Sequence, residues 1–301
     1  MTLVIIGLDA LDTKQIEHFD VDTFRLENWG RLESVSHQLD WPHTGEVWPT
    51  VATGLHPTEH GITMSGESEW DNVFLELGSK FTGHLPNNVR GSLGRKAKKV
   101  TGADWHIAYT DSPTIFDEPG RMVHNWPGVH RNDVLEYVWK QIDHSNDESI
   151  PEAQFDVELT GIAASQFGYV MEMIDQGVPL AATHVHMLDA AGHAYRFNEE
   201  HYRGFYEQAA EFVDRILDAL GEDDELLLLS DHGLRTEWTD DENIGVHSWR
   251  AYSGTTADTR PESVFDVKEW VEERVDDSDW DPETGDIDFD EEHLRDLGYV
   301  Q

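Results

Sequence analysis

The sequence predicts one α/β domain built on a doubly wound, mostly parallel central sheet with helices on both faces. Three apolar runs lead to this prediction, at residues 3–9, 180–189 and 225–233. Each run is rich in aliphatic residues and leads to an Asp, which is typical of a strand buried on both faces. A helical pattern between the second and third runs supplies the crossover that joins two parallel strands. The chain has 301 residues, 38% of them hydrophobic, enough to fill the core of such a domain.

The helix between the second and third runs is predicted over residues 198–221, with Gly221 as its stop. Its apolar side chains recur at helical spacing on one stripe: Phe205, Ala209, Phe212, Ile216 and Leu220. A second helix is expected over "TGEVWPTVATG" (44–54), with Thr44 at or near its N-cap and Gly54 as its stop. The pattern also predicts a strand at 121–129 and helices at 132–142 and about 155–176.

Two segments differ in composition from the rest. Residues 65–118 are rich in Gly and aromatic residues and contain a basic cluster: Lys80, Arg90, Arg95, Lys96, Lys98 and Lys99. We expect a small insertion here, either a surface hairpin that balances acidic neighbours or a lid that presents cations to an anionic substrate. Residues 276–301 are acidic and turn-rich, and predict a peripheral C-terminal strap. A single α/β domain that includes both segments is expected over residues 1–301.

The charge is strongly negative, with 61 acidic against 21 basic residues and a formal net charge of −40. Such a field repels nucleic acid duplexes and anionic membrane surfaces, so neither is an expected partner. Acidic residues spread along the chain are typical of a halophilic organism, because dense counterions screen their repulsion. The sequence has no signal-peptide pattern and no apolar run of roughly 18 residues, which predicts a soluble, cytoplasmic protein. Its oligomeric state cannot be read from these patterns.

Acidic residues stand where the three apolar runs end: Asp9, Asp189 and Asp231. The carboxyl ends of parallel strands open into one shared crevice, so these carboxylates should converge. Their mutual repulsion would raise their pKa values, which indicates a multivalent cation. Histidines lie close by in the sequence: His193 in "DAAGH", His232 in "SDHG" and His247 in "GVHSW". This mixed oxygen and nitrogen set, in a chain without cysteine, suits two divalent ions, zinc or manganese rather than calcium.

Each of these residues also has an ordinary interpretation. An Asp after a strand is often a helix N-cap, and a lone His is more often a surface residue than a ligand. Four of the 17 histidines are assigned to that ordinary class: His18, His144, His201 and His293. The joint placement of six candidates after three apolar strands favours the metal site.

Thr44 is the candidate nucleophile. A threonine hydroxyl is a weak nucleophile near neutral pH and needs a base, an N-terminal amine or a metal ion to activate it. Thr44 is far from the N-terminus in sequence, so a metal ion is the simplest activator, although Thr44 could also merely cap the helix. Thr50 and Thr53 fall inside the predicted helix and are expected to pack or to hydrogen-bond back to its carbonyl groups.

These motifs together resemble the alkaline phosphatase superfamily, and within it the branch of type I phosphodiesterases and nucleotide pyrophosphatases. That branch has an Asp at the end of its first strand, a nucleophilic Thr or Ser ahead of a "TG" pair, and later "HGI", "DxxGH", "SDHG" and a His. This chain has Asp9, Thr44 ahead of "ATGLHPTEHGI" (52–62), then "DAAGH", "SDHG" and His247. Its ending, "LRDLGYV" (294–300), is also similar to a frequent family ending. The matches therefore run through the whole chain in the family's order.

The resemblance implies an alkaline-phosphatase-like fold and a metal-dependent hydrolase of phosphate monoesters or diesters. In the family, one metal ion is held by the residues that match Asp9, Asp231, His232 and the Thr44 oxygen. The other ion is held by the residues that match Asp189, His193 and His247. Thr44 is then the nucleophile, and the reaction passes through a phosphothreonine.

The chain also departs from the family pattern. Gly45 and Glu46 follow the nucleophile, where relatives usually have a Pro-containing turn. Ser65 stands where nucleotide pyrophosphatases commonly place an Asn that contacts the phosphoryl oxygen. The segment between "SDHG" and His247 is too short to contain the recognition insert of nucleotide-cleaving relatives. We therefore expect a small phosphoester substrate, contacted by Ser65 and attracted by three lysines: Lys96, Lys98 and Lys99.

Two other functions remain open. A metal-dependent phosphomutase would return the phosphoryl group to the substrate, and it would need a closing cap that excludes water. A catalytically silent acidic protein could keep the metal scaffold for binding alone, although the intact set of ligands argues against it.

Overall fold

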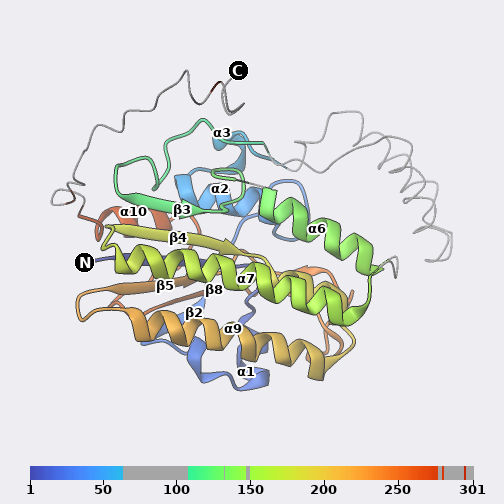
Figure 1. Ribbon diagram of the computed structural model, residues 1–301. Helices are drawn as coiled ribbons and strands as arrows, with labels where there is room; N and C mark the ends of the chain where they lie inside the picture. The colour runs from blue at the N-terminus through green and yellow to red at the C-terminus, as the bar shows by residue number, and fades with distance from the viewer. Residues whose placement is uncertain (64–107, 132, 147–149, 277–279, 281–294, 296–301) are drawn as a thin grey trace.

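The computed structural model describes residues 1–63, 108–131, 133–146, 150–276, 280 and 295 (Figure 1). Its helices are α1 (Thr13–Phe19), α2 (Thr44–Thr53), α3 (Pro57–His60), α6 (Asp133–Asn146), α7 (Glu152–Asp175), α8 (Met187–Tyr195), α9 (Glu199–Ala219) and α10 (Val267–Glu272). Its strands are β1 (Leu3–Leu8), β2 (Asn28–Arg31), β3 (Arg121–His124), β4 (Leu180–Val185), β5 (Glu225–Leu229), β6 (Gly233–Leu234), β7 (His247–Ser248) and β8 (Tyr252–Thr255). Two short 3-10 helices are η1 (Asp22–Phe24) and η3 (Glu237–Thr239).

The central sheet has six strands in the order β2-β8-β5-β1-β4-β3. β1 pairs in parallel with β4 and β5, and β3 pairs in parallel with β4. β8 runs antiparallel to both β5 and β2, so the antiparallel pairs lie at one edge. β6 and β7 form a separate antiparallel pair beyond the end of β5. The predicted α/β class with a mostly parallel sheet is confirmed.

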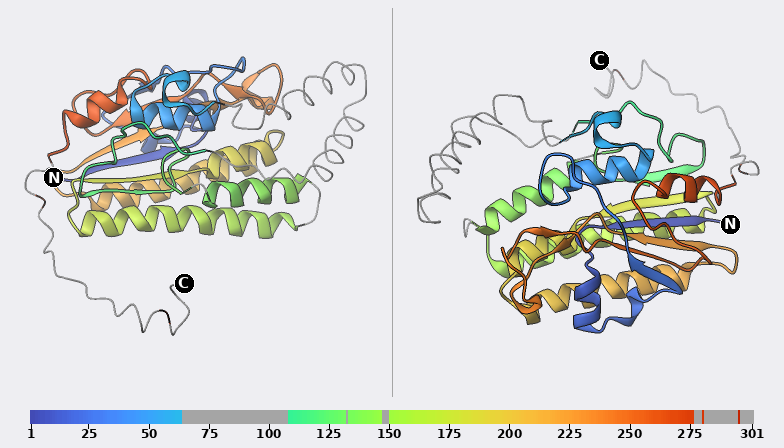
Figure 2. Two further views of the ribbon diagram at one scale, coloured as in Figure 1. Left: turned by 90° about the horizontal axis from the view of Figure 1, so that it is seen from above. Right: turned by 180° about the vertical axis from the view of Figure 1, so that it is seen from behind.

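Helices cover both faces of this sheet, and β1 contributes to both interfaces. Leu3 and Ile5 pack in one core cluster with Trp48 of α2. Val4 and Ile6 pack in the other cluster, with side chains of α7 and α9 such as Phe155, Phe167 and Val213. Figure 2 shows α2 and α10 on one side of the sheet and α7 and α9 on the other. This period-two alternation explains why the strand is apolar at every position.

A glycine at the centre of the sheet allows α2 to approach closely. A Cβ atom at Gly7 would lie 2.7 Å from the Trp48 ring, closer than side-chain carbons tolerate. Trp48 is fully buried and makes an edge contact with Trp126, with ring centroids 5.1 Å apart. The close packing of α2 on β1 brings the start of this helix to the carboxyl end of the strand.

Several predicted boundaries are wrong, and the predicted strand at 180–189 is the most important case. β4 ends at Val185, and Asp189 lies in the first turn of α8 rather than at a strand end. The apolar run continues because Met187 and Leu188 are also buried, and hydrophobicity alone does not separate a buried strand from a buried helix that follows it.

Other boundaries shift for local reasons. β3 ends at His124 instead of 129 because Asn125 takes a left-handed backbone conformation with φ of 53°. β5 likewise ends at Leu229, short of the predicted 233. α9 ends at Ala219, with Leu220 rather than Gly221 as its C-cap.

The predicted insertion is described only at its end, residues 108–118. There Ile115 and Phe116 join the core cluster of Trp48, and the Ile115 amide donates to the Ala52 carbonyl at 2.9 Å. The rest of the insertion and most of the strap at 276–301 lie outside the described residues, so the lid and the strap remain predictions. Among the described helices, none has the length and apolar character needed to cross a membrane.

Candidate active site

Two strand ends form the buried base of the candidate site. Asp9 follows β1, and Asp231 and His232 follow β5, the strand that pairs with β1. The Asp9 amide donates to the Val185 carbonyl at 2.9 Å, and the Ala10 amide donates to Asp231 Oδ1 at 3.5 Å. None of the three side chains has exposed surface. The register of the sheet therefore places two carboxylates and an imidazole together without solvent.

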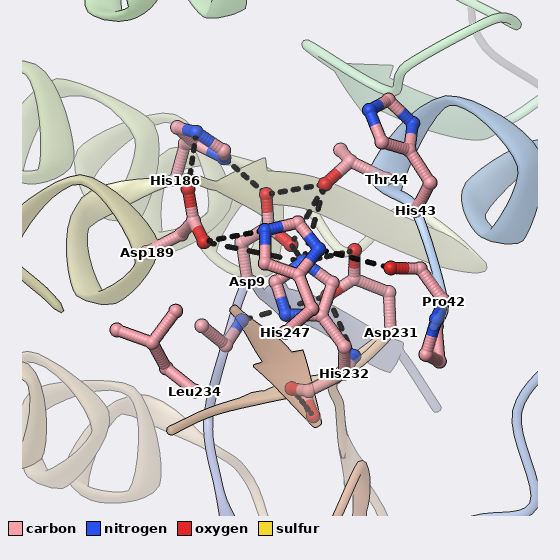
Figure 3. A network of polar contacts seen from close by, with 12 residues as sticks. Asp9, Pro42, His43, Thr44, His186, Asp189, Asp231, His232, Leu234 and His247 are labelled. Carbon is pink, nitrogen blue, oxygen red and sulfur yellow. Dashed lines mark hydrogen bonds and ion pairs between the residues drawn. The ribbon is translucent and has the colours of Figure 1, made fainter. Parts of the chain in front are cut away.

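Thr44 points its hydroxyl into this base. It is the first residue of α2, next to the N-cap rather than at it. Its Oγ1 lies 3.4 Å from each carboxylate oxygen of Asp9 and 3.4 Å from His232 Nε2 (Figure 3). The cap is made instead by His43, whose Nδ1 accepts a hydrogen bond from the Gly45 amide at 3.1 Å. The hydroxyl of Thr44 is thus available for chemistry rather than used to start the helix.

Thr50 and Thr53 behave as expected of residues inside the helix. The Thr50 hydroxyl donates to the Glu46 carbonyl at 2.9 Å, and the Thr53 hydroxyl donates to the Pro49 carbonyl at 2.7 Å. Neither belongs to the cluster around Asp9.

A helix and the β6–β7 pair build the second half of the site. Asp189 and His193 are four residues apart on α8 and so share one face, with His193 Nε2 at 3.4 Å from Asp189 Oδ1. The pairing of β6 with β7 places Leu234 opposite His247. His247 Nε2 then lies 3.6 Å from Asp189 Oδ1 and 3.4 Å from His193 Nε2. The structure thus brings together all seven residues predicted as metal ligands.

Two of the histidines are held in the tautomer that a metal ligand needs. His247 Nδ1 donates to the Pro42 carbonyl at 2.9 Å, and His232 Nδ1 donates to the Gly233 carbonyl at 3.2 Å. Because a carbonyl oxygen can only accept, each Nε2 carries a lone pair. Both lone pairs face carboxylate oxygens, and a cation between them would remove the repulsion.

Two carboxylate oxygens point to the same conclusion. Asp189 Oδ1 and Asp231 Oδ2 are buried, and neither receives a hydrogen bond within the described part of the chain. Asp231 Oδ2 instead lies 3.2 Å from His232 Nε2. Buried polar atoms are normally paired, so these oxygens fit a site that binds metal ions. Three overlapping groups here could each hold an ion: Asp9, Asp231 and His232; Asp189, His232 and His247; and Asp9, His184 and His186.

The profile of the type I phosphodiesterase / nucleotide pyrophosphatase family matches residues 3–290. The chain belongs to this family. The resemblance of the motifs is thereby confirmed, and the chain is a phosphoester hydrolase by family. No curated protein matches the chain.

Comparison with solved structures shows which fold this chain has. Alkaline phosphatase from the Antarctic bacterium TAB5 is similar with a TM-score of 0.50 and 9% identity, over 93% of this chain and 98% of that chain. A variant of the same phosphatase with bound magnesium gives a TM-score of 0.51 and 10% identity over the same shares. The PH0037 protein from Pyrococcus horikoshii has a TM-score of 0.42 and 12% identity, over 91% of this chain and 97% of that chain. The alkaline-phosphatase-like fold is confirmed.

Two further histidines of the site were not predicted from the sequence. His184, in β4, places Nε2 at 3.2 Å from Asp9 Oδ2. His186 contacts the same oxygen through Nδ1 and lies 3.0 Å from Asp189 Oδ2 through Nε2 (Figure 3). His186 therefore joins the two halves of the site. The signal was the alternation "HVH" at the end of an apolar run, since residues two apart on a strand share one face.

The buried charges shift pKa values in opposite directions. Burial, reinforced by the charge of Asp9, raises the pKa of Asp231 well above its ordinary value. Burial also disfavours ionisation of Asp9, but the charge of His186 and hydrogen bonds with Asp231 and two histidines together outweigh it and hold the pKa of Asp9 well below its ordinary value. For His186, burial is outweighed by the charges of Asp9 and Asp189, which raise its pKa to about 10.

The other residues named in the sequence analysis are four proposed substrate contacts and four histidines expected to be ordinary. Ser65, Lys96, Lys98 and Lys99 lie outside the described residues, so their contact with substrate stays a prediction. His18 and His201, expected to be ordinary, pair with Glu199 at 2.7 Å and with Asp156 at 3.0 Å. His144 and His293 have no described side chain.

Proposed function

We propose that this enzyme hydrolyses small phosphate esters in two steps, through a phosphothreonine at Thr44. The observation that carries the proposal is the position of the Thr44 hydroxyl, 3.4 Å from both oxygens of Asp9 and from His232 Nε2. In a phosphoester hydrolase, a hydroxyl beside a carboxylate and an imidazole lone pair is placed where a bound cation would lower its pKa and favour loss of its proton.

Two divalent ions fit the seven ligands. Asp9, Asp231, His232 and the Thr44 oxygen would hold one ion, and a second set would hold the other: Asp189, His193 and His247. Oxygen and imidazole ligands without sulfur suit zinc, with manganese as the alternative. When bound, the ions supply positive charge that stabilises an ionised alcohol and the phosphoryl oxygens.

The residues of the chain then perform the substitution. Thr44 loses its proton to solvent and its Oγ1 attacks phosphorus, while the bond from phosphorus to the ester oxygen breaks. The departing alcohol takes a proton from water, and Thr44 carries the phosphoryl group. A water molecule next attacks phosphorus on the side opposite to Thr44, which leaves with its hydroxyl restored. The products are an alcohol and phosphate, or a phosphate monoester if the substrate was a diester.

The short connection between β6 and β7 supports a small substrate. Only residues 235–246 connect the two strands. The two ends of this connection pair with each other, since the Arg235 amide donates to the Val246 carbonyl at 3.0 Å. This connection leaves no room for a recognition insert beside His247. A small phosphoester is therefore the proposed substrate, with Ser65 and the lysines at 96, 98 and 99 as proposed contacts.

Hydrolysis of p-nitrophenyl phosphate and of bis(p-nitrophenyl) phosphate tests the proposal. Each assay is run with zinc and with manganese separately, at low and at molar potassium chloride, because the formal net charge of the chain is −40. Acid quenching during turnover, followed by peptide mapping, should find the phosphoryl group on Thr44. A folded, metal-loaded protein that turns over neither substrate would contradict the proposed function.

A further inference from the structure

A histidine caps the helix that carries the nucleophile. His43 Nδ1 accepts from the Gly45 amide at 3.1 Å, which leaves the ring proton on Nε2. Ser, Thr, Asp and Asn are preferred at N-caps because a side-chain oxygen of each would satisfy the same amide.

The ring of His43 stands next to Thr44. The ring is partly exposed and stands outside the cluster of ligands, next to Thr44 (Figure 3). It lies near enough to Asp9, Asp189 and His247 to interact with their charges, and its centroid is 6.3 Å from that of His247. Nε2 has no hydrogen-bond partner among the residues that the structure describes. A fixed donor is thus left without an acceptor among the described residues, on a ring that stands next to the nucleophile.

We propose that His43 is a catalytic residue whose Nε2–H donates a hydrogen bond to a phosphoryl oxygen of the substrate as Thr44 attacks. This inference rests on the proposed function. Negative charge on the phosphoryl oxygens is stabilised best by donors that are already oriented, and the cap holds this ring before substrate arrives. His43 would supply an N–H donor in a chain where Ser65 replaces the Asn of nucleotide-cleaving relatives.

A second helix of the same chain provides a matched control. α3 begins after His56, whose Nδ1 accepts from the Thr58 amide at 3.3 Å. His56 is also partly exposed, but its ring stacks on that of Phe265, with ring centroids 6.4 Å apart. It has no described contact with the ligand cluster. His43 and His56 therefore share one structural role, and only His43 stands beside the nucleophile.

The test replaces both histidines with serine, which keeps an acceptor for the cap and removes the ring donor. His43→Ser should lower kcat for p-nitrophenyl phosphate by about 10- to 100-fold with little change in KM, somewhat less than the loss typical of a buried oxyanion donor. His56→Ser should stay within about twofold of the wild type. Metal content should be unchanged in both variants, and orthovanadate should inhibit His43→Ser more weakly than the wild type.

The outcomes separate the two proposals. A wild-type enzyme that turns over its substrate, with His43→Ser equally active and equally inhibited by vanadate, would overturn the role of His43 alone. Absence of turnover in the wild type would overturn the proposed function and this inference with it. His43→Ala gives a further check, since it also removes the cap: a catalytic defect found in His43→Ala but not in His43→Ser would assign His43 to capping only.

Discussion

The two halves of the active site differ in how they are built and in how much water reaches them. The buried half consists of Asp9, Asp231 and His232 at strand ends, with Thr44, and at most 3% of any of these residues is exposed. The open half consists of Asp189 on α8 and two histidines with more exposed side chains, His193 at 29% and His247 at 14%. Sheet register positions the first half, whereas the second depends on a helix and a short strand pair.

This difference predicts that the two halves retain their ions differently and respond differently to mutation. The buried half is held by the core and contains the proposed nucleophile, so we expect it to keep its proposed ion and its geometry under most perturbations. The open half should exchange its ion with solvent and should respond to changes in the chain around β6 and β7. The following predictions separate the halves, from the largest expected effect to the smallest.

Thr44→Ala removes the reacting atom of the buried half. We expect kcat to fall by on the order of 10⁴-fold or more, as is typical when a covalent nucleophile is deleted. Metal content should stay near that of the wild type, because all Asp and His ligands remain. The control is Thr50→Ala in the same helix, which should remain active. If Thr50→Ala is the inactive variant, the nucleophile has been misassigned.

Arg250→Ala removes the ion pairs of Arg250 with Asp12 and Asp241, beside the open half. Arg250 Nε contacts both oxygens of the fully buried Asp12 at 2.9 Å, and its other nitrogens contact Asp241 at 2.8 Å. Asp12 in turn accepts from the Leu234 amide at 3.1 Å, next to His247 in the β6–β7 pair. Loss of Arg250 leaves a buried carboxylate without its cation, so the free energy of unfolding should fall by about 3 kcal/mol.

Chemical denaturation measures this change. Asp241→Asn is the matched control, since it keeps the bond from Arg250 to Asp12; a change below about 1 kcal/mol is expected for this more exposed partner. Equal losses in the two variants would show that Asp12 is not the residue that depends on Arg250.

His247→Ala removes one ligand from the open half. The affinity for one of the two ions should fall by at least about 100-fold, since even the loss of an outer-shell partner typically costs 10- to 100-fold. Elemental analysis after gel filtration should find one ion per chain, and added zinc should restore part of the activity. Loss of both ions at once would show that the halves do not bind metal independently.

Metal binding to the buried half should release protons. In the metal-free protein, burial and the charge of Asp9 raise the pKa of Asp231 well above its ordinary value, so this carboxyl stays protonated to higher pH. Because a bound ion requires the carboxylate, the apparent affinity for zinc should increase with pH until Asp231 ionises. Titration of metal-free protein with zinc in weak buffer should therefore acidify the solution, and Asp231→Asn should release fewer protons.

The same shift predicts how stability depends on pH without metal. A carboxyl with a raised pKa in the folded state favours folding while it is protonated, and this contribution is lost as pH rises from about 4 towards the folded-state pKa. Burial lowers the pKa of His43 to about 4 and that of His247 to about 3, and these shifts act in the opposite direction in the same range. The contribution of Asp231 is therefore the difference between the metal-free wild type and metal-free Asp231→Asn, and the wild type should lose stability relative to this variant as pH rises. Thermal melts of both metal-free proteins across pH test the sign, and a wild type that gains stability relative to Asp231→Asn in this window would contradict it.

The motifs predicted more of the candidate site than the boundaries of the elements did. All six Asp and His candidates meet around Thr44, although Asp189 arrives on α8 rather than at a strand end. A residue in the first turn of a helix that follows a strand still lies at the carboxyl edge of the sheet, so this error left the site unchanged. His184 and His186 were missed although the alternation "HVH" marks them, and His43 was missed because a polar residue before a helix has no distinguishing local pattern.

The sequence by itself determined the buried strands, the class of the fold and the residue types of the site. Those features depend on local spacing: apolar residues at every position mark a strand buried on both faces, and short motifs hold ligands at fixed separations. Tertiary structure alone decided that His186 joins Asp9 to Asp189 and that the ring of His43 stands beside Thr44. Such contacts follow from the register of β1 with β4 and from the packing of α2 on Gly7, which connect residues far apart in the chain and leave no periodic trace in it.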